Sequence, residues 1–174
     1  MAHRLSASLR ESGALVGGAL AAAALVGSLA QLSRGGFPGA HDSGDLDWIG
    51  GALAVCSTVP LVAWRRAPAA VFVLTASAGV LLAGLGYPIG LLLGPTVALY
   101  LFVASRDEEQ RWTRRSTGLV VGLFSAYLLA VALDGGGFPG SELLHTGLAW
   151  AAAWFAGERT RLRREQIAEL KERA

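Results

Sequence analysis

The chain has very little of what catalysis requires. Among its 174 residues there are one cysteine, Cys56, and three histidines, His3, His41 and His145. No nucleophile pairs with a base along the sequence, and neither a phosphate loop nor a set of metal ligands with a recognised spacing is present. We therefore expect no catalytic, cofactor-binding or metal-binding residues in this stretch. A single cysteine excludes a disulfide within the chain. Because no thiolate-stabilising group flanks Cys56 in "LAVCSTVP", a buried and inert thiol is predicted.

Charged residues are also missing from the middle of six apolar runs. Each run has about 16–21 residues, close to the roughly 20 that a helix needs to cross a bilayer. Only helices or closed barrels satisfy the backbone in lipid, and continuous runs without alternation indicate helices. The sequence predicts an all-α polytopic membrane protein with six transmembrane helices, over Gly13–Ser33, Leu46–Trp64, Ala69–Leu85, Pro88–Ser105, Ser116–Leu133 and Glu142–Gly157. The first run could instead be a signal peptide, but an uncleaved span is favoured because further spans follow. Pro60 and Pro95 can kink the second and fourth helices.

The distribution of basic residues predicts the orientation in the membrane. Fourteen of the fifteen arginine and lysine residues lie in segments that share one side of the six runs, and only Arg34 lies on the other side. Cytoplasmic segments carry the excess of arginine and lysine. Both termini are therefore predicted to be cytoplasmic, in a bacterial plasma membrane. The absence of ionisable residues from the middle of the spans speaks against a small transporter or channel.

The segments on the outer side hold the acidic residues and two of the histidines. A metal site or pH sensor could be built there, but spacings such as "HDSGDLD" match no strong ligand motif. The sequence favours a solvated acidic surface and leaves open whether these residues bind anything. They are His41, Asp42, Asp45, Asp47 and His145, with Asp134 and Glu142 nearby.

The last residues change character abruptly. "ERTRLRREQIAELKERA" has no glycine or proline and is rich in strong helix formers, so a helix is predicted over 158–174. Ile167, Leu170 and Ala174 have the 3–4 spacing of a short coiled-coil seam, which Thr160 extends and Arg163 interrupts. We predict a membrane domain over 1–157 and the start of a cytoplasmic signalling helix over 158–174. A basic helix held at anionic lipid is the alternative.

The segments "LVAWRRAPAAVFVL", "VALYLFVASRDEEQRW" and "WFAGERTRLRREQIAELKERA" resemble segments of a known family, the DesK-type sensor histidine kinases of actinobacteria. "LVAWRRAPAAVFVL" is similar to the turn between their second and third spans, and "VALYLFVASRDEEQRW" to their fourth span and its inner loop. "WFAGERTRLRREQIAELKERA" is similar to their last span and signalling helix.

The resemblance implies an input domain of a two-component system that acts as a homodimer in the lipid bilayer. A kinase core with a phosphoacceptor histidine and an ATP-binding domain would follow the helix, and a response regulator would bind that core. No nucleic-acid partner is expected. The alternative is a stand-alone integral membrane protein of structural or accessory type. The stimulus cannot be read from these residues.

Overall fold

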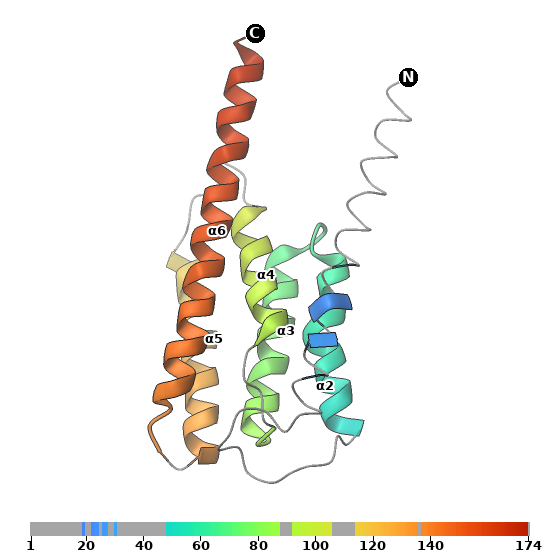
Figure 1. Cartoon of the computed structure of the whole chain (residues 1–174), viewed down its shortest axis with the longest axis vertical. Coiled ribbons are helices and arrows are strands. Elements are labelled where there is room, and N and C mark those ends of the chain that lie inside the picture. The colour runs from blue at the N-terminus through green and yellow to red at the C-terminus, as the bar shows by residue number, and fades with distance from the viewer. Residues whose placement is uncertain are drawn as a thin grey trace.

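The computed structural model describes residues 19, 22–24, 26–27, 30, 48–87, 92–105, 114–135 and 137–173. These residues form an all-α structure, and no strand occurs among them. The described residues between 19 and 30 are helical (Figure 1). The remaining elements are α2 (Trp48–Thr58), the 3-10 helix η1 (Val59–Ala63), α3 (Pro68–Gly84), α4 (Leu93–Ala104), α5 (Arg114–Gly135) and α6 (Gly140–Glu172). The predicted all-α class is confirmed. Most of the first apolar run lies outside the described residues.

Proline and glycine set several helix ends. Pro68 begins α3, where its missing N–H leaves no intrahelical bond unmade. Gly86, with φ +76°, forms the turn after α3. Pro60 lies in the first turn of η1, so the second helix tightens into a 3-10 helix instead of kinking. Pro95 is the third residue of α4. A kink at Pro95 was therefore the wrong prediction, because α4 begins only two residues before it.

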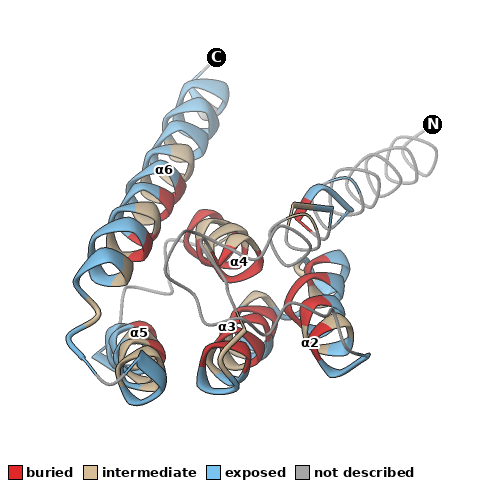
Figure 2. Cartoon of the chain, turned by 60° about the horizontal axis from the view of Figure 1, so that its bottom comes forward, coloured by how far each residue is buried: buried red, intermediate tan, exposed pale blue. Residues whose placement is uncertain are grey.

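The helix α3 lies at the centre of the arrangement and packs against α2, α4 and α5 (Figure 2). Phe72 of α3 is fully buried and stacks on Phe102 of α4, with ring centroids 6.0 Å apart. Leu99 and Val103 of α4 are also fully buried in the same core. The burial of these apolar side chains holds α3 and α4 together.

Two helices approach very closely at Gly94. A Cβ atom at this position of α4 would collide with the backbone carbonyl oxygen of Ser57 in α2. The hydroxyl of Ser57 donates to the Ala54 carbonyl at 2.8 Å, so it is satisfied within its own helix. Small residues permit such contact between helices. The glycine fixes the distance between α2 and α4.

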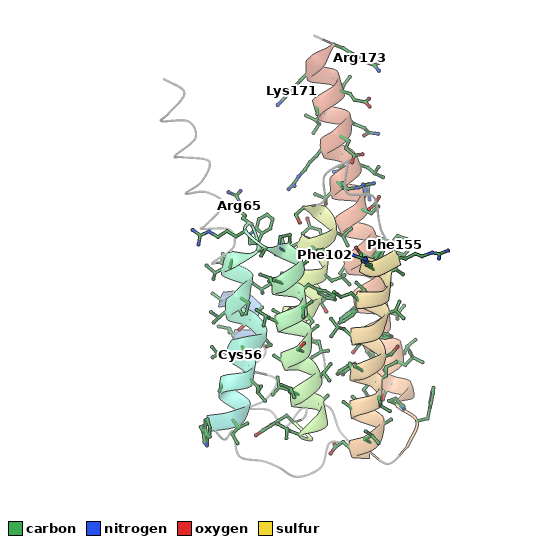
Figure 3. The ribbon with its side chains drawn as sticks, turned by 180° about the vertical axis from the view of Figure 1, so that it is seen from behind. Cys56, Arg65, Phe102, Phe155, Lys171 and Arg173 are labelled. Carbon is green, nitrogen blue, oxygen red and sulfur yellow. The ribbon has the colours of Figure 1, made fainter. Side chains whose placement is uncertain are left out.

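The outer surface of the bundle is strongly apolar. Val121, Leu129 and Leu133 of α5 are 56%, 60% and 75% exposed. Cys56 of α2 is exposed as well (Figure 3), so the prediction of a buried thiol is wrong. The reason is that α2 lies at the edge of the bundle and Cys56 is on a face that no described helix covers.

One helix of the described chain, α5, has both the length and the apolar composition to cross a membrane. Its 22 residues rise about 33 Å, against about 30 Å of hydrocarbon. The segments Trp48–Ala63, Pro68–Gly84 and Leu93–Ala104 are shorter apolar helices.

Candidate functional site

The outer-side residues were the sequence's candidates for ligand binding. Of these, His41, Asp42, Asp45 and Asp47 lie outside the described residues. His145 is exposed in the second turn of α6, where its Nδ1–H donates to the Ser141 carbonyl at 2.8 Å. No three histidine, cysteine, aspartate or glutamate side chains gather in the part of the chain that the structure describes. His145 therefore has the surroundings of a helix-surface residue.

The long helix α6 gives the site of greatest interest. It runs for 33 residues without a break and passes through Gly157, the predicted end of the membrane domain. Its C-terminal turns project beyond the other helices (Figure 1). From Gln166 to Lys171 every side chain is exposed. The segment predicted as the start of a signalling helix is thus continuous, as far as Glu172, with the part of α6 inside the bundle.

A close contact at Gly157 joins α6 to α4. A Cβ atom on Gly157 would lie 2.8 Å from Val103 Cβ and 2.9 Å from the Tyr100 carbonyl oxygen. Ala153, one turn earlier, is also buried. A side chain larger than hydrogen at position 157 would force the two helices apart. Both small residues therefore lie on the face of α6 that meets the core.

Two polar contacts continue the same junction past Gly157. The Tyr100 and Thr160 hydroxyls share a hydrogen bond of 3.3 Å. Thr160 already donates to the Ala156 carbonyl at 2.8 Å, so Tyr100 is the donor between the helices. One turn further on, Arg164 Nη1 donates to the Ala104 carbonyl, at the last residue of α4, at 3.4 Å. We call Tyr100, Val103, Ala104, Gly157, Thr160 and Arg164 the α4–α6 junction.

Thr160, which the sequence placed on the predicted coiled-coil seam, is in contact with α4. Gly157, Thr160, Arg164 and Ile167 are three or four residues apart and therefore share one face of α6. The first three contact the end of α4. Ile167 follows on the same face but is 53% exposed. The helix face that α4 covers inside the bundle thus continues, uncovered, into the tail.

Ion pairs on α6 stiffen the helix just where it leaves the bundle. Arg161 Nη2 lies 2.7 Å from Glu158 Oε1, and Arg161 Nε lies 3.6 Å from Glu165 Oε1. Spacings of three and four residues bring such side chains together on a helix surface. They are partly exposed, so each pair contributes little to stability.

Basic residues gather at this end of the molecule. Arg65 lies at the end from which α6 projects, and Lys171 and Arg173 extend beyond it (Figure 3). The Arg65 guanidinium lies 5.5 Å from the centre of the Trp64 ring, a distance typical of a cation–π contact. Arg114 and Arg115 begin α5 at the same end (Figure 1). The acidic Asp134 lies in the last turn of α5 and Glu142 in the first turn of α6, so both lie at the other end of the bundle from these basic residues.

Sequence reasoning missed the partner of α6. α5 precedes α6 in the chain and a short loop joins them, yet α6 packs mainly against α4 (Figure 2). The signal in the sequence is the series Ala153, Gly157 and Thr160, which marks one face of α6 but not the helix that meets it.

Comparison with known proteins gives one match. A family model described as "Domain of unknown function (DUF7134)" matches residues 5–164, nearly the whole chain. No curated protein and no solved structure matches.

Proposed function

Because the chain belongs to the DUF7134 family, whose description gives no activity, we propose a function from the structure and from the resemblance to sensor kinases. The proposed function is a membrane-embedded input domain that relays a stimulus through α6 to a cytoplasmic kinase core. The chain would be a six-span protein of the bacterial plasma membrane, with both termini in the cytoplasm.

The apolar exterior and the placement of charge support the membrane location. Leu81, Leu133 and Leu148, on three different helices, are 55%, 75% and 62% exposed. Water disfavours such surfaces and hydrocarbon accepts them. Arginines concentrate at one end of the described bundle, as expected for a cytoplasmic side.

The observation that carries the relay is the continuity of α6 across the α4–α6 junction. Because the helix is unbroken from Gly140 to Glu172, a rotation or shift within the bundle reaches the tail without loss at a hinge. The contacts of Gly157, Thr160 and Arg164 tie that movement to α4. The stimulus would therefore act by changing how α4 and α6 pack.

The kinase core and the homodimer rest on the family resemblance. The exposed Ile167 and Leu170, at 53% and 68%, offer a short seam to a second copy. A response regulator would bind the kinase core and not this domain.

Cysteine labelling tests the orientation. In a background with Cys56→Ser, Phe138→Cys places a thiol in the exposed loop before α6, and Lys171→Cys places one in the exposed tail. We expect a membrane-impermeant maleimide to label the first in intact cells and the second only after permeabilisation. Labelling of Lys171→Cys in intact cells would contradict a cytoplasmic tail.

Reading the gene beyond codon 174 tests the kinase assignment. We expect the frame to continue into a helix with a phosphoacceptor histidine and then into an ATP-binding domain. A stop codon directly after codon 174 would contradict that assignment. The stand-alone membrane protein would then be the better account.

A further inference from the structure

The first turns of α6 extend past the described start of α4. The two helices run in the same direction, because the α4–α6 junction reaches later residues of α6 as α4 proceeds. Tyr100 of α4 lies opposite Gly157. Both helices rise equally per residue, so Leu93, at the start of α4, lies near the level of Trp150. The part of α6 before Trp150 therefore depends on another helix for its contacts.

The helix α5 supplies contacts to this outer part of α6. The Phe124 ring lies 5.4 Å from the Trp150 ring, and a Cβ atom added to Gly147 would lie 3.5 Å from Phe124. One turn further along α5, the side chain of Tyr127 is hydrogen-bonded to that of Thr146. Tyr127 is 1% exposed and Thr146 is fully buried. A single buried pair of hydroxyls thus joins α5 to α6 beside aromatic contacts.

Thr146 differs from another buried threonine in its choice of partner. A threonine in a helix usually donates to a carbonyl of its own preceding turn. Thr58, which is equally buried, donates in this way to the Ala54 carbonyl at 2.9 Å. The Thr146 hydroxyl makes no such bond within α6. The carbonyl of Glu142, one turn earlier in α6, is nevertheless in the position that this usual bond requires.

Two alternative partners are therefore within reach of one hydroxyl. A hydroxyl carries a single proton, which rotates to suit its acceptor, and two lone pairs. When Thr146 turns from Tyr127 to the Glu142 carbonyl, its hydroxyl stays paired, so the exchange avoids the penalty for a buried group without a partner. Glu142 also acts electrostatically on Tyr127. Its half-buried carboxylate is an acceptor for the Tyr127 hydroxyl once Thr146 has turned.

We infer that Thr146 is a two-position latch between α5 and α6. In the first position, which the structure shows, its hydroxyl pairs with Tyr127 and holds the outer part of α6 against α5. In the second position the hydroxyl donates to the Glu142 carbonyl of its own helix, and α5 is released. The latch goes beyond the proposed function, because its two positions can be measured without any signalling output.

The direction of a change in stability tests for the second position. Tyr127→Phe removes the first partner of Thr146 from the full chain in detergent. With a second position, Thr146 then donates within α6, and adding Thr146→Val should lower the midpoint of thermal unfolding. Without one, Tyr127→Phe leaves the Thr146 hydroxyl buried and unpaired, and adding Thr146→Val should raise the midpoint. A rise would overturn the inference.

Thr58→Val is the matched control, because Thr58 is fully buried and paired within its own helix. It measures what the loss of one such bond does to the midpoint. Thr146→Val in the Tyr127→Phe background should lower the midpoint by the same amount. In the wild-type chain, Thr146→Val should lower it further than Thr58→Val does, because the Tyr127 hydroxyl then loses its partner as well. A smaller loss than that of Thr58→Val would contradict the first position.

Fluorine NMR follows the latch with both threonines in place. A fluorinated tyrosine replaces Tyr127, and we expect two resonances, or one whose position changes steeply with temperature. The same label in place of Tyr100 is the control, since its partner Thr160 already donates to the Ala156 carbonyl and has no second position to take. Equal temperature dependence at the two sites would overturn the inference. None of these outcomes bears on whether α6 relays a signal, so the two proposals fail separately.

Discussion

Replacement of Gly157 by leucine is expected to push α6 away from α4 and to lower the free energy of unfolding by about 1–3 kcal/mol. The new Cβ would meet Val103 Cβ at 2.8 Å and the Tyr100 carbonyl oxygen at 2.9 Å. Backbone and β-branched atoms cannot move aside as the end of a flexible side chain can. The midpoint of thermal unfolding in detergent, followed by circular dichroism, measures the loss.

The matched control is Gly122→Leu on α5. A Cβ at Gly122 would meet nothing within 4 Å among the described residues, so this variant should unfold at the wild-type midpoint. Tyr100→Phe sharpens the test. This substitution should lower the free energy of unfolding measurably when made in the wild-type chain. Made in Gly157→Leu, it should have no effect, because the helices are then too far apart for the hydrogen bond between Tyr100 and Thr160. An unchanged midpoint in Gly157→Leu would show that α6 is not held at this junction.

Insertion of one alanine after Gly157 is expected to turn the tail by about 100° relative to the bundle. If the bundle sets the orientation of α6, the tail residue that faces a second copy moves back by one position. In a Cys56→Ser background, single cysteines at 166–170 report that face by disulfide formation between copies in membranes. We expect the strongest cross-links at Ile167 and Leu170 in the wild type, and at Gln166 and Glu169 after the insertion.

Insertion of seven residues provides the control. Seven residues turn a helix through nearly two full turns, leaving the tail within about 20° of its original direction. The cross-links should therefore remain at Ile167 and Leu170. If they remain there after the one-residue insertion as well, the tail pairs through its own seam without regard to the bundle. The connector role of α6 would then be wrong.

The sequence predicted the bounds of a helix well where proline and glycine mark its two ends. The third run was predicted as Ala69–Leu85 and the helix is Pro68–Gly84, because a proline and a glycine turn bound it. The fourth run was predicted from Pro88, but α4 begins at Leu93. The run includes residues 88–91, which lie outside the described residues. An apolar run alone does not mark the residue at which a helix begins, since helical and non-helical residues can have the same hydropathy.

The sequence could not show which helix faces contact one another. Gly118 and Gly122 have the same spacing as Ala153 and Gly157. A Cβ on Gly118 or Gly122 would meet no described residue within 4 Å, whereas a Cβ on Gly157 would meet α4. Thr146 and Thr58 are both fully buried threonines in apolar runs. Thr58 donates to Ala54 of its own helix, whereas Thr146 lies beside Tyr127 of α5. These differences come from the neighbouring helices, which local sequence does not specify. The same limit explains Cys56, whose exposure follows from the position of α2 at the edge of the bundle.

Among the described residues, Arg164 makes the last contact by which α6 is held to another helix, and the side chains from Gln166 to Lys171 are all exposed. If α6 relays a stimulus as proposed, the identity of the domain joined to that stretch does not matter to the input. A foreign domain fused after Glu165 in the same helical phase is then expected to respond to the same stimulus, so the bundle would serve as a portable module with a reporter of choice.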